Sequence, residues 1–231
     1  MSKKLIRLIR SVFMEHVPES PVDAVKQGVP DKPIRSHAPI YPPEDRGIAF
    51  VGAEALIESQ HDLIKRIRLL TGVMDDEFRE MYLRPIRNVA AYIDALPATE
   101  HGHHNGAGGL FRLVLELSFY SMQASEGVIF SAREGVEIRR ELEPRWRYST
   151  FIAGLCCELH RVIREMLVVS PSGSEWPVHR TSLSNWLKEV GEDHYYVKWV
   201  KESIHGYGST SILVTKIIPD SCLQFIQQGS L

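Results

Sequence analysis

Residues 108–120 read Gly-Gly-Leu-Phe-Arg-Leu-Val-Leu-Glu-Leu-Ser-Phe-Tyr, and this stretch indicates the fold class most strongly. Apolar residues in it recur at steps of three and four, the spacing that places side chains on one face of an α-helix. The positions concerned are Leu110, Leu113, Val114, Leu117 and Tyr120. The stretch therefore predicts a strongly apolar helix, entered from a glycine-rich loop over residues 99–109.

The segments on either side repeat the helical spacing. Before the loop, one helix is predicted over residues 56–70, ended by Gly72, and a second over 75–93, kinked by Pro85. After the apolar helix, a fourth is predicted from Pro144, a favoured first-turn residue, to Leu167. Shorter helices are predicted over Leu183–Val190, His194–Val200 and Ser211–Ile218, with a short extended piece near Leu167–Val169. No alternation of period two persists, so the sequence predicts an all-α fold class.

The composition excludes several classes of protein. Of 231 residues, 44% are hydrophobic and 24% are charged, which excludes disordered, collagen-like and coiled-coil chains. The net charge of −2 carries no global signature of nucleic-acid binding. No apolar run is long enough to span a membrane, and three cysteines, two of them adjacent, favour a reducing compartment. We therefore expect a cytoplasmic protein.

The chain divides into three predicted parts. Residues 1–17 form a basic amphipathic helix whose polar side carries Lys3, Lys4, Arg7 and Arg10. This helix either contacts a membrane surface or DNA phosphates, or docks on its own domain or a partner. Residues 18–47 are a Pro-rich linker that holds seven of the thirteen prolines, and residues 48–231 form the folded helical domain.

The loop before the apolar helix carries the first candidate site. His101, His103 and His104 lie within four positions and are followed by a glycine-rich segment. Neutral imidazole is a common ligand of transition metals, and a loop can turn neighbouring rings towards one ion. Short histidine-rich runs on surface loops also occur without any metal. Gly108 and Gly109 at the helix start would in addition let an anion approach free backbone N–H groups.

The second candidate lies on the fourth helix, where Cys157 and Glu158 are both competent zinc ligands. Adjacent residues of a helix diverge by about 100°, so a shared ion needs ligands from other helices. The alternative is a small buried thiol pair at the edge of the core, with Glu158 facing solvent. A third candidate, Arg145-Trp146-Arg147, offers two cations beside an aromatic ring for contact with DNA or a partner. These arginines are also compatible with ordinary helix-surface charges.

The order of these segments resembles a known family. Residues 97–117, with the histidine run followed by Gly-Gly-Leu and a Leu-Glu-bearing helix, resemble the three-histidine segment of MobH-type (TraI-like) relaxases. These relaxases belong to conjugative plasmids and integrative conjugative elements. Residues 123–131 and 143–147 are also similar to the family, and a weaker likeness extends from Tyr41 to Pro219. The resemblance implies an HD-domain-like helical bundle, related to metal phosphohydrolases in which His and Asp residues hold divalent ions.

This sequence departs from the family pattern at the ligand positions. Gly102 replaces the first histidine of the triplet, and Leu113 stands where the helix carries a histidine. Cys157-Glu158 stands in place of the His-Asp dyad, and Thr215 aligns with the family's final aspartate. Leucine cannot bind a metal ion, and a divalent site depends on each of its ligands. The departures therefore favour a retained fold with altered chemistry.

Two hypotheses follow for a bacterial protein of conjugation or mobile-element processing. In the first, the chain is a catalytically degenerate HD-like domain, a pseudoenzyme that binds DNA and conjugation-machinery proteins. In the second, it is an active metal-dependent phosphohydrolase or nicking nuclease with manganese, iron or zinc in a rebuilt site. The ligands would then be His101, His103, His104, Cys157 and Glu158, and a metal-bound water would be the nucleophile. The sequence leaves open a fragment of a longer relaxase, the oligomeric state and any DNA sequence preference.

Overall fold

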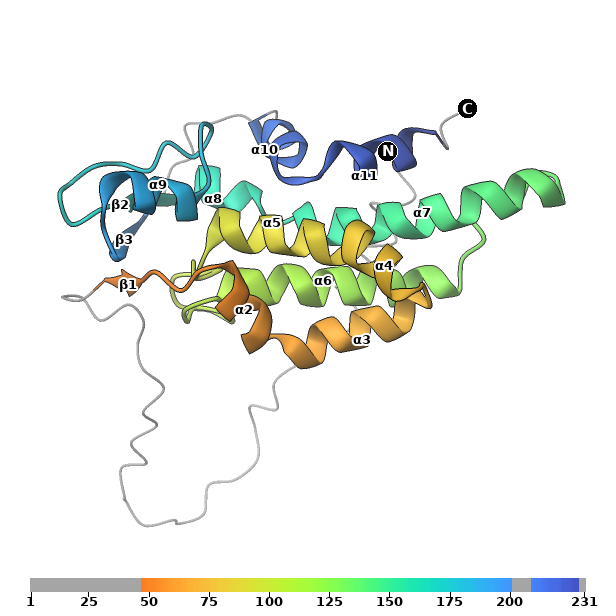
Figure 1. Ribbon diagram of the computed structural model, residues 1–231, viewed down its shortest axis with the longest axis horizontal. Coiled ribbons are helices and arrows are strands. Elements are labelled where there is room, and N and C mark those ends of the chain that lie inside the picture. Colours follow the sequence, from red (N-terminus) through yellow and green to blue (C-terminus); the bar gives the residue numbers. More distant parts are fainter. Residues whose placement is uncertain (1–46, 201–208, 229–231) are drawn as a thin grey trace, which may run out of the picture. The chain divides into compact units, whose positions relative to one another are not determined.

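The computed structural model describes residues 47–200 and 209–228 (Figure 1). The predicted helix over 1–17 lies outside these ranges, as does the predicted linker up to residue 46. The division of the chain into three parts therefore stays a prediction. Among the described residues, no helix has the length and apolarity needed to cross a membrane.

The described part is mainly helical, which confirms the predicted fold class, and it adds a small sheet. The helical elements are α2 (Ala53–Ser59), α3 (His61–Thr71), α4 (Asp75–Glu77), the π-helical η1 (Phe78–Leu83), α5 (Arg84–Ile93), α6 (Gly109–Glu126), α7 (Val136–Cys156), α8 (His160–Arg164), α9 (Leu183–Val190), α10 (Ser209–Ile217) and α11 (Asp220–Gln227). The strands are β1 (Ile48–Ala49), β2 (Met166–Val169) and β3 (His194–Trp199), arranged antiparallel in the order β1-β3-β2.

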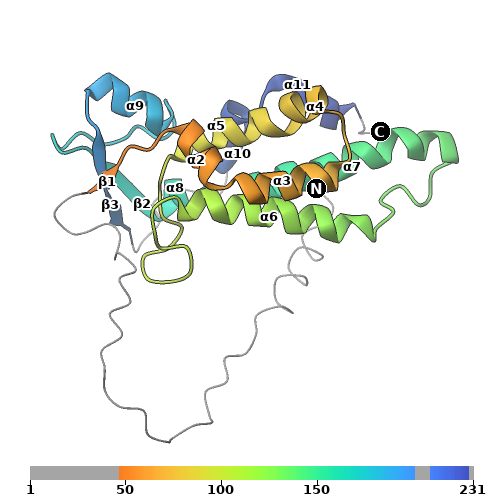
Figure 2. The same ribbon diagram turned by 60° about the horizontal axis from the view of Figure 1, so that its bottom comes forward.

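Helices α6 and α7 form the longest packed pair, and they lie side by side in both ribbon views (Figures 1 and 2). Gly154 permits their close approach. A Cβ atom added to Gly154 would lie 2.7 Å from the Cα of Ser118, on the backbone of α6. Backbone atoms cannot move aside as a flexible side chain can, so the absence of a side chain at Gly154 sets the spacing of the two helices.

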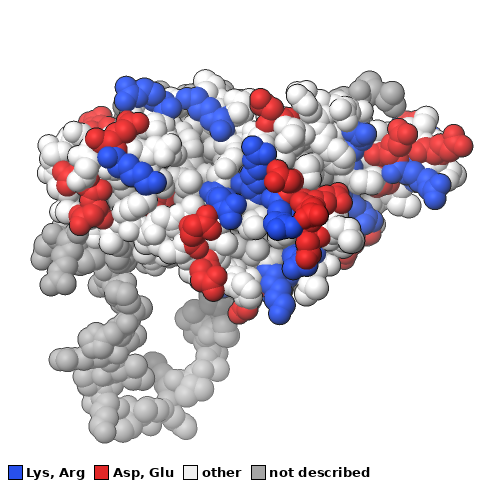
Figure 3. All heavy atoms as spheres, in the orientation of Figure 1, with Lys and Arg blue, Asp and Glu red and all other residues white. Residues whose placement is uncertain are grey.

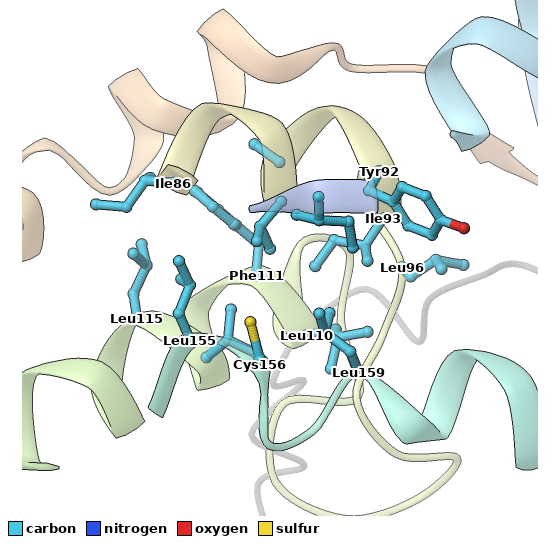
Figure 4. Close-up of a cluster of buried hydrophobic side chains, with 14 of the residues drawn as sticks. Ile86, Tyr92, Ile93, Leu96, Leu110, Phe111, Leu115, Leu155, Cys156 and Leu159 are labelled. Carbon is cyan, nitrogen blue, oxygen red and sulfur yellow. The ribbon is translucent and has the colours of Figure 1, made fainter. Parts of the chain in front are cut away.

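The core forms where α5, α6 and α7 meet. Phe111, Leu115 and Leu155 are fully buried there, and the thiol of Cys156 points into the same apolar cluster (Figure 4). Burial raises the pKa of the Cys156 thiol to about 12, which keeps it protonated and unreactive at neutral pH. The predicted apolar helix therefore supplies the centre of the core.

The predicted helix over His194–Val200 is wrong, because residues 194–199 form the strand β3. β3 is the middle strand: Tyr195 lies opposite Ile48 of β1, and Val197 lies opposite Val168 of β2. The aromatic and β-branched residues of this segment favour extended backbone when partner strands are present. The extended piece expected near Leu167–Val169 is confirmed as part of β2.

Two helix boundaries also differ from the prediction. The predicted helix over 56–70 is two helices, α2 and α3, that meet at Gln60. α7 begins at Val136 rather than at Pro144, and it ends at Cys156. Pro144 lies inside α7 and lacks the N–H that would bond the carbonyl of Arg140. Nearby, the side-chain Nε of Arg145 donates to the carbonyl of Glu141 at 3.2 Å, which adds a bond to this turn.

Asp94 joins the end of α5 to the sheet and to α2. It is fully buried, and its φ of +43° is uncommon for a residue other than glycine. Its carboxylate accepts hydrogen bonds from the backbone N–H groups of Gly52, at 2.7 Å, and Val51, at 3.3 Å, and from the hydroxyl of Tyr195, at 3.3 Å. Burial raises the pKa of Asp94, while these hydrogen bonds act in the opposite direction. The loop that follows Asp94 leads directly to the histidines.

Candidate functional site

The histidine loop has a defined backbone structure. The carbonyl of His104, which has a φ of +61°, accepts a hydrogen bond from the N–H of Ala98 at 2.8 Å. The hydroxyl of Thr99 donates to the carbonyl of His103 at 2.8 Å. A Cβ atom on Gly109 would lie only 2.0 Å from the carbonyl oxygen of His104, so only glycine fits where the loop enters α6.

The backbone N–H groups at the start of α6 are already bonded. The N–H of Gly108 donates to the carbonyl of Ala95 at 2.9 Å, and that of Leu110 donates to the carbonyl of Leu96 at 3.0 Å. The N–H of Gly109 donates to the carbonyl of Gly106 at 3.0 Å. The expectation that Gly108 and Gly109 offer free N–H groups to an anion is therefore wrong. Backbone carbonyls of the segment that follows Asp94 accept the hydrogen bonds of these N–H groups.

The three histidine side chains do not converge. Nε2 of His104 lies 3.3 Å from a carboxylate oxygen of Glu116, whose other oxygen accepts from Nε of Arg112 at 2.8 Å. The side chain of His101 is 86% exposed, and its nearest charged partner is Glu100 at 3.6 Å. His103 is exposed as well. The structure thus pairs His104 with an acid on α6 and leaves the other two rings at the surface.

Cys157 and Glu158 lie in the turn between α7 and α8. Glu158 accepts a hydrogen bond from Nε of Arg161, and Nη1 of the same guanidinium bonds Glu165 at 3.0 Å. One permanent cation therefore lies between two carboxylates at this turn. The residue Cys157 is exposed, but desolvation around its thiol and the nearby Glu158 carboxylate raise the pKa of Cys157 to about 12. Without a metal ion, the Cys157 thiol is therefore protonated at neutral pH.

The two remaining positions of the family pattern carry no ligand chemistry. Leu113 lies on α6 and packs against the hydrophobic core. Thr215 lies exposed on α10, where its hydroxyl donates to the carbonyl of Ile212 at 2.9 Å. Within residues 47–200 and 209–228, no three side chains of His, Cys, Asp or Glu are grouped so that they could hold a metal ion. The residues present do not fit the metal site that the resemblance implies.

A polar cavity of about 500 Å³ lies beside the histidine loop, and no sequence pattern predicted it directly. It is lined by the junction of α2 with α3 and by the outer face of α6. Arg66 lies over the ring of Phe119 at 4.3 Å, and Glu116 connects the cavity to His104. The pair Arg112–Glu116, spaced four residues apart, was the only available hint that this face of α6 is polar.

The three residues of the Arg145–Arg147 candidate have different surroundings, and all lie inside α7 rather than at a helix start. The guanidinium of Arg145 donates to the carbonyl of Phe225 and to Oε1 of Gln228, both at 3.0 Å, and so holds α11. The ring of Trp146 stacks on Phe130, with centroids 5.7 Å apart. Arg147 is exposed. Within the described ranges, the head group of Arg145 is hydrogen-bonded and that of Arg147 is not.

The charges on the face shown in Figure 3 are intermingled. Arginines of α3, η1 and α5 pair with nearby acids, for example Arg84 with Glu80 at 3.2 Å and Arg87 with Glu54 at 2.8 Å. Paired surface charges of this kind give no extended positive field. On this face, a nucleic acid would meet alternating charges rather than a basic stripe.

The comparison with known proteins gives one match. The sequence model of the TraI_2 family, described as "Putative helicase", matches residues 48–230. The chain belongs to the TraI_2 family. Membership confirms the coarser part of the resemblance, a relation to TraI-like conjugative relaxases. The TraI_2 match begins at β1 and contains all three candidate sites. Among curated proteins, none matches the chain.

Proposed function

We propose that this TraI_2 domain is a catalytically degenerate, HD-like relative of MobH-type relaxases. It acts in the bacterial cytoplasm, in conjugative DNA transfer or mobile-element processing, as a module that binds DNA and conjugation proteins. Family membership supports the conjugation context. The altered chemistry is supported by the side chains at the positions of the family ligands.

The observation that carries the proposal is the pairing of Arg161 with Glu158 and Glu165. In the family pattern, the His-Asp dyad stands at positions 157–158 and would hold a divalent ion. Here the guanidinium of Arg161 already bonds both carboxylates and offsets part of their charge, and its own charge would repel a metal ion brought to the same oxygens. Two further features also oppose metal binding. Leu113 offers no ligand atom, and the imidazole of His104 is already paired with Glu116.

DNA binding is the part of the proposal that a titration tests directly. The candidate contacts are Arg147 and Trp146 on α7, together with Lys3, Lys4, Arg7 and Arg10 of the N-terminal segment. Phosphate contacts release counterions, so log K falls with log salt with a slope of about −0.9 per neutralised phosphate on duplex DNA.

The experiment is a fluorescence-anisotropy titration of the full chain with labelled single-stranded and duplex oligonucleotides at several salt concentrations. The proposal predicts salt-dependent binding, weakened in Arg147→Gln and unchanged in the control Lys188→Gln. Lys188 is exposed on α9 and is changed by the same amount of charge. Affinity that does not vary with salt, or equal affinity of the two variants, would remove α7 from the DNA-binding surface.

A further inference from the structure

A second cavity, of about 520 Å³, lies away from the histidine loop. It lies between the end of α3, η1, the end of α6, the first half of α7 and Phe225 of α11. Leu70, Val73, Met81 and Met122 give it an apolar wall. Its volume is within the range of cavities that hold small molecules. Neither the family match nor the predicted site residues account for this cavity, apart from Arg147 at its edge.

The wall contributed by α7 is charged. In the second half of α7, the stripe of Tyr148, Phe151 and Leu155 is buried in the core. Towards the start of α7, at steps of three and four residues, the same face of the helix carries Arg140. Arg139, Glu143 and Arg147 lie on either side of this face. All four residues line the cavity. The cavity therefore has one apolar wall and one wall rich in arginine.

Arg139 has an unused donor at this wall. Its Nη2 donates to the carbonyls of Ala132 and Glu134, both at 3.2 Å. Its Nε is buried and has no acceptor in the part of the chain that the structure describes. A buried donor without a partner costs about 1–3 kcal/mol, so such groups usually bond to a water or a ligand.

The carboxylate on the same wall, that of Glu143, already has hydrogen-bond donors. Glu143 accepts from the backbone N–H of Ser131 at 2.8 Å and from its hydroxyl at 2.6 Å. Although partial burial opposes ionisation, these bonds and the nearby charge of Arg147 hold the pKa of Glu143 below its usual range. Arg140 makes no ion pair with any residue of the described ranges. On this wall three arginines face one glutamate, while the two other acids of the lining, Glu77 and Glu126, lie outside α7.

We propose that this cavity binds a small amphiphilic anion, with an apolar body and a carboxylate or sulfonate head group. The head group accepts hydrogen bonds from Nε of Arg139 and from Arg140, while the body covers the apolar wall. Glu77 and Glu126 also line the cavity. An amphiphilic cation is therefore the main competing ligand, and the test must include it. This site contains none of the expected metal ligands, and it shares only Arg147 with the candidate DNA contacts.

The test uses the full chain and the fluorescence of anilinonaphthalene sulfonate, which rises when the dye enters an apolar site. Decanoate, decanol and decyltrimethylammonium, each below its micellar concentration, then compete with the dye. The three share one alkyl chain and differ in the charge of the head group. Naphthoate in a fourth arm distinguishes an aromatic body from an alkyl one. The proposal predicts that decanoate or naphthoate displaces the dye at a concentration about tenfold lower than decanol.

Three variants locate the binding. Arg140→Gln is predicted to weaken anion binding about tenfold, the value of one charged hydrogen bond. Val136→Trp, at a residue that is 72% exposed and lines the cavity, should obstruct the dye. Arg133→Gln is the control, because it removes an equal charge from the neighbouring loop, outside the cavity. Since Arg140 and Val136 are exposed, these changes should leave the fold intact, which far-ultraviolet circular dichroism checks.

The proposal is overturned if the dye does not bind, or if decanol or the ammonium compound competes as well as decanoate. It is also overturned if Arg140→Gln and Arg133→Gln behave alike, since the anion would then not be held by α7.

Discussion

Gly109→Ala tests how the histidine loop is built. The added Cβ would lie 2.0 Å from the carbonyl oxygen of His104, whereas ordinary contacts begin near 3.4 Å, so the oxygen must move by about 1.4 Å. That carbonyl accepts the N–H of Ala98, a fully buried residue, at 2.8 Å. Overpacking costs about 1–3 kcal/mol, and the buried donor left unbonded costs about 1–3 kcal/mol more. Alanine loses less backbone entropy on folding than glycine does, which offsets up to about 1 kcal/mol of this destabilisation.

The predicted net loss in the free energy of unfolding is about 1–6 kcal/mol, which corresponds to a fall in Tm of at least about 2 °C for a chain of this size. Gly106→Ala is the control within the same loop, because a Cβ there meets nothing within 4 Å. Denaturant unfolding and calorimetry of the three proteins give the comparison. Equal stability of Gly109→Ala and Gly106→Ala would refute the described approach of the loop to α6.

Three further predictions concern the packing of the helices and one buried acid. Gly154→Ala forces α6 and α7 apart and should lower the free energy of unfolding by about 1–2 kcal/mol in a urea titration; a stabilised variant would contradict the close helix contact. Arg145→Met removes two hydrogen bonds to Phe225 and Gln228, a third to Glu141, and the stacking on Phe225 at 5.0 Å. Amide exchange in α11 should therefore accelerate, and unchanged exchange would mean that α11 is held by other contacts. Burial raises the pKa of Asp94 above its ordinary value of 3.8, so its contribution to stability is greatest below that value and is lost as pH rises through the raised pKa. Asp94→Asn has no such proton, and the stability of the wild type relative to this variant should therefore decline as the pH rises above 3.8; a constant difference would contradict a raised pKa.

Local patterns in the sequence predicted the helical parts of this fold well. The spacing of Leu110, Val114 and Leu117 located α6, and Gly72 marked the end of α3, where its φ of +64° suits glycine. These signals are carried by neighbouring residues, so they need no knowledge of the rest of the chain. The strand β3 was missed because its extended form depends on partners that are distant in sequence, such as Ile48 and Met166.

The sequence named candidate ligands, and whether they form a functional site stays a prediction. The sequence singled out His104 and Glu158, and the structure places both in polar surroundings. Their partners, Glu116 and Arg161, were not predicted, because a pairing depends on rotamers and on the turn between α7 and α8. Residue types that can bind a metal, even at a spacing typical of a site, therefore do not reveal which ion or side chain they contact.

The central claim is that the family's metal-binding positions no longer assemble a site in this chain. Metal content per chain, measured by inductively coupled plasma mass spectrometry on protein purified without a histidine tag or chelating column, tests it most directly. The account predicts manganese, iron and zinc far below one ion per chain, with no uptake of added Mn²⁺ or Zn²⁺. Near-stoichiometric metal that is lost in His103→Ala or Glu158→Ala would contradict it and would support the rebuilt phosphohydrolase site.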